Sequence, residues 1–303
     1  MTPASALDQV PQARILVLGA SGLLGSHVFD EFSKRFETIG TYLGSTDHLT
    51  KNMHKLNASN FKDLSSLIHD EAPSVIINCL GLTDVEICEL RPEASWKLNA
   101  EVPIYISKLA KVKNIKFIHI STDHFTSEVA KPRSETDLMT PINQYGFSKL
   151  QAEKSILFNN SDSLVLRTNF FGHSSSGKRS ILDFALSSFS KRQVFAGFDD
   201  VIFSPVGIHE VSRFLLSESA ERATGILNLA SARPLSKYEF MLLVARATGY
   251  SESLVQRSEI KSSDLKVRRP PYLALDPERL IHEFNHYMPT IEVMLKEELS
   301  TIP

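Results

Sequence analysis

The sequence predicts an α/β fold in which a doubly wound parallel sheet is joined to a smaller C-terminal α/β lobe. Between residues 14 and 167, short β-branched or apolar runs alternate with longer amphipathic stretches. This alternation is typical of βαβ units, whose helices cover both faces of a parallel sheet. A turn with three spaced glycines follows the first apolar run, where such a sheet would pass into its first helix.

The individual elements follow from this pattern in chain order. Strands are expected at residues 15–18, 38–42, 74–79, 116–120 and 163–166, and connecting helices at 24–34, 60–69, 92–112 and 144–157. After residue 172 the regularity weakens, and we expect a Ser-rich loop at 174–176, a helix from Ile181, a short strand near 226–229 and a helix opened by Ser236. The predicted organisation is a disordered leader at 1–13, a first domain at 14–172, and a lobe at 173–303 from which some segments return to the core of the first domain.

Composition and charge exclude several classes of partner. The 303 residues have a formal net charge of -2 with both signs spread along the chain, so no basic stripe is present to bind nucleic acid. The first 13 residues lack the basic start and apolar core of a signal peptide, and no run of about 18 apolar residues predicts a membrane span. With only Cys79 and Cys88 as cysteines, we expect a cytoplasmic protein. Its expected partners are small molecules or a second copy of the chain, as in a homodimer.

The glycine turn has the spacing of a dinucleotide site. Gly19 permits a tight turn, Gly22 lets the backbone approach a pyrophosphate, and Gly25 allows close packing of helix on strand. The anion then lies against free N–H groups at the helix N-terminus. The first domain is therefore expected to be a Rossmann-type domain that binds NAD(P).

The end of the second strand indicates which dinucleotide is preferred. Rossmann strands at this position often end in Asp or Glu, which binds the ribose diol of NAD, or lie near an Arg that accepts the extra phosphate of NADP. Residues 40–45 contain neither kind of residue. The missing acid favours NADP, with NAD as the alternative, and Thr41 and Ser45 could donate hydroxyl groups to the phosphate.

A tyrosine and a lysine have the spacing needed for proton transfer. Tyr145 is followed four residues later by Lys149, so both side chains lie on one face of a helix. A nearby ammonium stabilises the phenolate and lowers the pKa of the tyrosine. Tyr145 could then exchange a proton with a carbonyl oxygen while a nicotinamide exchanges hydride. A hydroxyl that holds the same oxygen is expected from Thr122, or second from Ser121, at the end of a strand.

These motifs together resemble the extended short-chain dehydrogenase/reductases, and within them the dTDP-4-dehydrorhamnose reductase (RmlD-like) family of nucleotide-sugar reductases. The similarity covers about residues 14–283 and includes segments 78–83, 98–100, 121–123, 141–149, 167–168, 199–205, 236–240 and 269–270. The resemblance implies a C-terminal substrate-binding lobe and NAD(P)H-dependent reduction of the 4-keto group of a nucleotide-linked 6-deoxyhexose. The nucleotide sugar is then the expected substrate.

The resemblance also assigns residues to the site. Its catalytic positions are Thr122, Tyr145 and Lys149; its cofactor positions are Gly19, Ser21, Gly22, Leu23, Leu24, Gly25, Tyr42, Asn57, Gly81, Thr83, Tyr145 and Lys149; and its substrate positions are Ser121, Asp123, His124 and Asn169. Several positions depart from the family pattern, and Val201, Phe203 and Val206 replace more polar or smaller residues. His124 stands where a tyrosine is usual, in a segment that faces the substrate, and Asn57 replaces an aspartate that contacts adenine. No metal is expected.

Other readings of the sequence remain open. Residues 172–178 match most of a phosphate-binding P-loop, but Arg179 stands where the Mg²⁺-binding Ser or Thr should follow. His282 and His286 have the spacing of a zinc-protease helix, although few residues remain to supply a third ligand. Two further alternatives are a non-catalytic NADP-binding regulatory subunit and a nucleotide-sugar epimerase or dehydratase. Net consumption of NADPH would separate these from a reductase.

Overall fold

A parallel sheet forms the centre of the computed structural model, which describes residues 13–44, 50–125, 130–173 and 180–302. The expected leader apart from Ala13, the Ser-rich loop and Ser45 lie outside this part of the chain. Within it, seven strands pair in the order β11-β6-β5-β4-β1-β2-β3, and every pairing is parallel. The strands are β1 (Arg14–Leu18), β2 (Glu37–Tyr42), β3 (Met53–Lys55), β4 (Val75–Asn78), β5 (Lys116–Ile120), β6 (Leu164–Arg167) and β11 (Gly225–Asn228). The predicted doubly wound fold is therefore confirmed.

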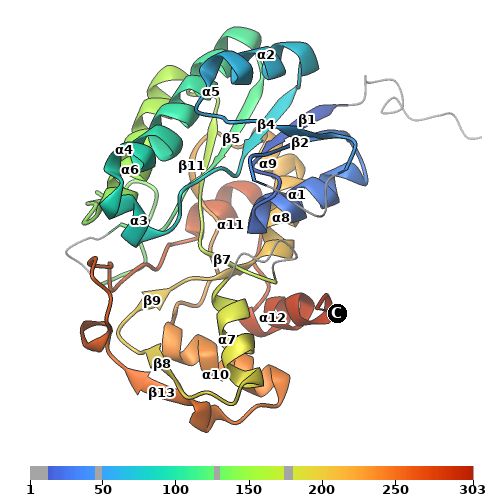
Figure 1. Cartoon of the computed structure of the whole chain (residues 1–303). Helices are drawn as coiled ribbons and strands as arrows, with labels where there is room; N and C mark the ends of the chain where they lie inside the picture. Colours follow the sequence, from blue (N-terminus) through green and yellow to red (C-terminus); the bar gives the residue numbers. More distant parts are fainter. Residues whose placement is uncertain (1–12, 45–49, 126–129, 174–179, 303) are drawn as a thin grey trace, which may run out of the picture.

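The first strand shows why the apolar runs are continuous. Ile15 and Val17 of β1 belong to one buried cluster, whereas Leu16 and Leu18 belong to another. Successive side chains of a strand point to opposite faces, so both faces of this sheet are covered. Helices α2, α5 and α6 pack on one face, and α1, α8, α9 and α11 contribute to the cluster on the other (Figure 1).

The helices around the sheet lie close to their predicted positions, with one interruption. They are α1 (Leu23–Ser33), α2 (Phe61–Glu71), α3 (Val85–Leu90), α4 (Pro92–Trp96), α5 (Val102–Lys113) and α6 (Gln144–Asn159). The segment expected to be one helix at 92–112 is helical throughout, but a π-helical turn at Lys97–Glu101 connects α4 to α5. Pro103, in the first turn of α5, has no N–H to donate to the preceding turn, and the Val102 N–H instead bonds to the Lys97 carbonyl.

Segments after residue 172 divide between the two parts of the molecule in Figure 1: some return to the main sheet and its covering helices, and the others build the lower part. Their helices are α7 (Ile181–Ser190), α8 (Ile208–Leu215), α9 (Glu218–Arg222), α10 (Lys237–Thr248), α11 (Glu278–Phe284) and α12 (Ile291–Ser300), with short 3₁₀ turns at Glu252–Leu254 and Ile260–Ser262. Short strands pair as β10 (Val206–Gly207) with β7 (Phe170–Phe171), β12 (Leu235–Ser236) with β9 (Ile202–Phe203), and β13 (Val255–Ser258) with β8 (Phe195–Phe198). The strand expected near 226–229 is β11, which pairs with β6 of the main sheet. Ser236 begins α10 with a capping box, as its sequence predicts.

The strand order reverses between β1 and β4. From β1 the chain winds outward through β2 and β3, and from β4 it winds the other way through β5 and β6. The loops that follow β1 and β4 therefore run in opposite directions and leave a crevice between them. Open α/β sheets bind ligands in this crevice. Within the described residues, no helix is long and apolar enough to cross a membrane.

Candidate active site

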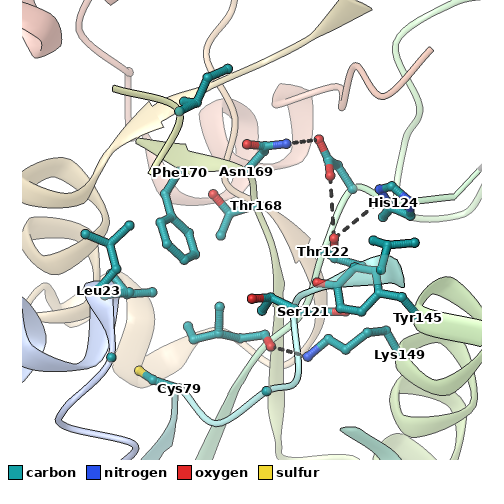
Figure 2. A pocket seen from close by; sticks show the side chains of 18 of the residues that line it. Leu23, Cys79, Ser121, Thr122, His124, Tyr145, Lys149, Thr168, Asn169 and Phe170 are labelled. Atoms are coloured by element: carbon teal, nitrogen blue, oxygen red, sulfur yellow. Dashed lines mark hydrogen bonds between the residues drawn. The ribbon is translucent and has the colours of Figure 1, made fainter. Parts of the chain in front are cut away.

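A cavity of about 460 Å³ lies at the carboxyl edge of the main sheet, and its walls come from both parts of the chain (Figure 2). Among the residues expected at the site, those that line it are Gly22, Leu23, Leu24, Gly25, Gly81, Thr83, Ser121, Thr122, Asp123, His124, Tyr145, Lys149 and Asn169. Gly19, Ser21, Tyr42 and Asn57 do not line it. The C-terminal lobe closes the cavity with Ile181, Phe203 and Lys237.

The glycine turn brings the backbone close to one end of the cavity. Gly19 has φ +81°, a conformation that side chains rarely adopt. A Cβ added to Gly25 would lie 2.1 Å from the Gly19 carbonyl oxygen, so only glycine fits there. Gly22 is the N-cap of α1 and provides no side-chain cap, which leaves N–H groups of the first turn to bind an anion. These features fit the pyrophosphate of a dinucleotide.

Thr41 has a structural role instead of the expected contact with a phosphate. Its side chain is buried, and its hydroxyl accepts a hydrogen bond of 3.1 Å from the Gly19 N–H. Thr41 therefore holds the glycine turn against β2. Tyr42 ends β2, and the exposed Asn57 accepts a bond from the Ser59 N–H, so both expected cofactor residues lie at the sheet edge outside the cavity.

Tyr145 and Thr122 form one wall of the cavity. Tyr145 lies in the first turn of α6 and Thr122 directly after β5. Burial raises the pKa of Tyr145 above its usual range, and a hydrogen bond to the Thr122 side chain acts in the opposite direction. The phenol is thus held in its protonated form beside a hydroxyl, which suits a proton donor.

Lys149 does not act on Tyr145 as the sequence suggested. Its Nζ donates to the Ile120 carbonyl at 2.6 Å and lies 3.1 Å from Nε2 of His119. The expectation that Lys149 lowers the pKa of Tyr145 is therefore wrong for this arrangement, in which burial of the phenol dominates. Burial also lowers the pKa of Lys149 to about 8, although the Glu153 carboxylate opposes this shift.

Ser121 belongs to a buried ion pair. Its hydroxyl donates to Glu153 at 2.5 Å, and Glu153 accepts from the Arg167 guanidinium at 2.7 Å. These side chains are nearly inaccessible, so the pair fixes the position of α6 against β6. Of the two hydroxyls considered at the end of β5, Thr122 is therefore the one that faces Tyr145.

Asp123 and Lys237 form a polar wall of the cavity, and of these two residues the sequence predicted only Asp123. The Asp123 carboxylate accepts a 2.7 Å hydrogen bond from the Asn169 amide, and burial raises its pKa to about 6 (Figure 2). Lys237, the first residue of α10, acts on it electrostatically from the C-terminal lobe. The capping motif at Ser236 predicts that residue 237 starts a helix, but no local signal placed that helix at this cavity.

The hydrogen bonds of His124 define which ring nitrogen carries its proton. The Asn143 carbonyl oxygen accepts from the Gly146 N–H, so the Asn143 amide nitrogen faces Nε2 of His124 at 3.0 Å. Nε2 must then accept, and the proton of the neutral ring lies on Nδ1. Burial lowers the pKa of His124 to about 3, which keeps the ring neutral. His124 packs edge-on against Tyr145 with ring centroids 5.4 Å apart, so it offers an N–H donor beside the phenol.

Of the two alternative motifs, the structure describes only the histidine pair in full. Helix α11 ends at Phe284, and His286 lies beyond it, 3.2 Å from the Glu210 carboxylate. His282 and His286 are therefore not presented on one helical face. Among the described residues no group of three or more potential metal ligands is found. Most of the P-loop-like segment, residues 174–178, lies outside the described part of the chain.

Comparisons with known proteins agree with this architecture. The chain is 26% identical over 281 residues to the probable low-salt glycan biosynthesis reductase Agl14 of Haloferax volcanii, covering 91% of this chain and 94% of that protein. Over 159 residues it is 32% identical to the methionine adenosyltransferase 2 subunit beta of Mus musculus, which is 52% of this chain and 47% of the subunit. The structure of dTDP-4-dehydrorhamnose reductase from Bacillus anthracis in complex with NADP superposes with a TM-score of 0.86 at 18% identity, covering 96% and 100% of the two chains, and this likeness shows the fold.

A family model gives the assignment. The model described as the RmlD substrate binding domain matches residues 13–302, nearly the whole chain. The matched region contains the glycine turn, the Tyr145 and Lys149 pair, and the lobe that carries Lys237. The protein therefore belongs to the RmlD substrate binding domain family.

Proposed function

We propose that the protein is an NADPH-dependent reductase that converts the 4-keto group of a nucleotide-linked 6-deoxyhexose to a hydroxyl. The observation that carries this proposal is the position of Tyr145, whose protonated phenol and neighbouring Thr122 hydroxyl share one cavity with the glycine turn. The names of the relatives support the same chemistry. The Bacillus anthracis neighbour is a dTDP-4-dehydrorhamnose reductase in complex with NADP, and Agl14 is a glycan biosynthesis reductase.

The cofactor would lie along the glycine turn. Leu23, Leu24 and Gly25 provide backbone N–H groups for the pyrophosphate, and Gly81 and Thr83 line the same cavity after β4. The second strand ends without an acid, which supports NADPH over NADH. When bound, the reduced nicotinamide supplies a hydride.

The residues of the chain would then complete the reduction. Thr122 and Tyr145 bind the carbonyl oxygen through their hydroxyl groups and so orient the carbon toward the hydride. As the hydride adds to carbon, Tyr145 transfers its phenolic proton to the oxygen, which yields the alcohol. His124 donates from Nδ1 to an oxygen of the sugar, and Asp123, Asn169 and Lys237 form the polar wall that holds the other hydroxyls.

The experiment is a screen of 4-keto-6-deoxy sugar nucleotides with NADPH and with NADH. We expect oxidation of one NADPH for each sugar reduced, followed by the loss of NADPH absorbance and by chromatography of the product. Conversion of the sugar without net use of NADPH would instead identify an epimerase or dehydratase. Binding of NADPH without conversion of any sugar nucleotide would favour a regulatory subunit.

We also infer a cytoplasmic location and a homodimer. Cys79 and Cys88 are both free, which supports a reducing compartment. Light scattering of the purified chain tests the homodimer, and a monomeric mass would contradict it.

A further inference from the structure

His119 lies at the centre of a buried hydrogen-bonded chain that the proposed reaction does not use. It sits in β5, fully inaccessible, between Asn78 at the end of β4 and Lys149 of α6. Asn78 Nδ2 lies 3.0 Å from His119 Nδ1, and Lys149 Nζ lies 3.1 Å from His119 Nε2. The ring therefore connects Lys149, which lines the cavity, with Asn78, which ends the neighbouring strand β4.

The orientation of Asn78 determines where the ring proton lies. The Leu80 N–H donates to the Asn78 carbonyl oxygen at 3.1 Å, so the amide nitrogen is the group that faces His119. An amide nitrogen only donates, and Nδ1 must therefore accept. Burial holds the pKa of His119 well below its usual range, so the ring is neutral. Its single proton then lies on Nε2, directed at Lys149.

This arrangement distinguishes between the two charge states of Lys149. A neutral amine has a lone pair that accepts the Nε2–H bond, and it still donates to the Ile120 carbonyl at 2.6 Å. An ammonium has no lone pair. Protonated Lys149 would require the ring proton to move to Nδ1. There the N–H would face the Asn78 amide nitrogen, which cannot accept it. If the Asn78 amide flipped, its carbonyl oxygen would accept from Nδ1–H but could no longer accept from the Leu80 N–H. Each alternative loses one hydrogen bond.

We propose that Asn78 and His119 are positioning residues that favour the neutral amine of Lys149 and so make this lysine a group that can exchange a proton. Burial also favours the neutral amine and lowers the pKa of Lys149 to about 8, whereas the Glu153 carboxylate of α6 and Cys79 after β4 act in the opposite direction. The proposal rests on the proposed reduction, in which Lys149 lines the cofactor end of the cavity.

The ring proton can be observed directly, without substrate or turnover. The full-length protein is labelled with ¹⁵N-histidine and ¹³C-lysine, and the His119 and Lys149 signals are identified by their loss in His119→Phe and Lys149→Met. At a pH well above 8, the approximate pKa of Lys149, we expect the nitrogen chemical shifts of His119 to show a proton on Nε2. A proton on Nδ1 in the unmodified protein at that pH would overturn the proposal.

A double-mutant cycle then tests whether the ring transmits the effect. In Asn78→Asp a carboxylate can accept from Nδ1–H, so the tautomer should reverse and Nε2 should accept from the Lys149 ammonium. We expect the titration midpoint of Lys149, followed at its Cε signal, to rise by about one pH unit or more, the effect of one buried hydrogen bond. In the His119→Phe background, Asn78→Asp should shift that midpoint much less. Equal shifts in both backgrounds would show a through-space charge effect and would contradict the proposal.

The two proposals fail in different ways. Absence of reductase activity with every sugar nucleotide would leave the tautomer and the Lys149 titration unchanged. Conversely, a ring proton on Nδ1 would leave the activity screen unaffected. Asn78→Asp should also move the alkaline limb of the pH–rate profile in the same direction as the Lys149 titration, a result that a merely structural role would not produce.

Discussion

The Asn169 amide donates a hydrogen bond of 2.7 Å to the Asp123 carboxylate, which ties the segment after β6 to the end of β5. Asp123 is only 3% exposed, and burial raises its pKa to about 6 in the folded protein, against 3.8 as the ordinary value. The folded state therefore takes up a proton between about pH 4 and pH 6 that the unfolded chain does not hold. Through this group, stability rises as the pH falls across that window and declines as the pH rises through 6.

Asp123→Asn should remove that pH dependence. The uncharged amide avoids burial of an ionised group, so the variant should gain about 3 kcal/mol relative to the native protein at pH 7, and this gain should shrink toward pH 4. Urea unfolding of both proteins at several pH values measures the difference. A difference in unfolding free energy that stays constant from pH 4 to pH 7 would contradict the raised pKa of Asp123.

Tyr145→Phe should abolish reduction while leaving NADPH binding nearly unchanged. The substitution removes the proton donor but keeps the ring that packs against His124. General acid catalysis contributes about 10²- to 10⁴-fold, and we expect kcat to fall within that range. The control is Tyr105→Phe, since Tyr105 stacks on Phe61 away from the cavity. If Tyr145→Phe keeps full activity, the assignment of Tyr145 is wrong.

His124→Phe should weaken binding of the sugar nucleotide and leave NADPH affinity unchanged. Phenylalanine can keep the edge-on contact with Tyr145 but has no Nδ1–H to donate. Loss of one neutral hydrogen bond is worth about 1 kcal/mol, so KM should rise roughly fivefold. Steady-state kinetics with saturating NADPH measure this change. An unchanged KM would show that His124 serves only to pack the wall.

Gly25→Ala should prevent NADPH binding or folding of the first domain. The new Cβ would lie 2.1 Å from the Gly19 carbonyl oxygen, and backbone cannot yield as a flexible side chain can. Gly44→Ala is the matched control, because an added Cβ there meets nothing within 4 Å. Thermal melts with and without NADPH measure both effects. Equal stabilisation of Gly25→Ala and Gly44→Ala by NADPH would contradict the requirement for glycine at position 25.

Glu153→Gln should destabilise the fold strongly. It leaves the Arg167 guanidinium buried without its counter-ion, and breaking such a pair costs about 3–5 kcal/mol. The exposed pair of Lys111 and Asp162 supplies the control, since Asp162→Asn should change stability little. Chemical unfolding compares the two variants. Similar losses from both would show that burial of the Glu153 pair is energetically unimportant.

Particular elements show how far the sequence alone could be interpreted. The five strands expected in the first domain lie within a residue or two of β1, β2, β4, β5 and β6, because most of their side chains are buried and their segments are rich in apolar or β-branched residues. Strand β3 was not in the expected set, since its three residues are largely exposed and carry no apolar pattern. The helix expected at 92–112 contains a π-helical turn, which directly precedes the turn where Pro103 lacks a backbone donor.

The candidate site likewise has features that the sequence predicts and features that depend on tertiary contacts. Glycine spacing, the four-residue spacing of Tyr145 and Lys149, and the position of Thr122 after a strand are local features, and the structure brings these residues to one cavity. The direction of the Lys149 side chain is not local. It depends on the Ile120 carbonyl and the His119 ring, which a neighbouring strand supplies.

The sequence by itself therefore determined the parallel sheet, the glycine turn and the family, because each depends on the order and periodicity of neighbouring residues. Only the tertiary structure decided that Lys237 closes the cavity, that Ser121 is engaged by Glu153, and that burial raises rather than lowers the pKa of Tyr145. These outcomes depend on contacts and burial among residues far apart in the chain. Local spacing carries no information about either.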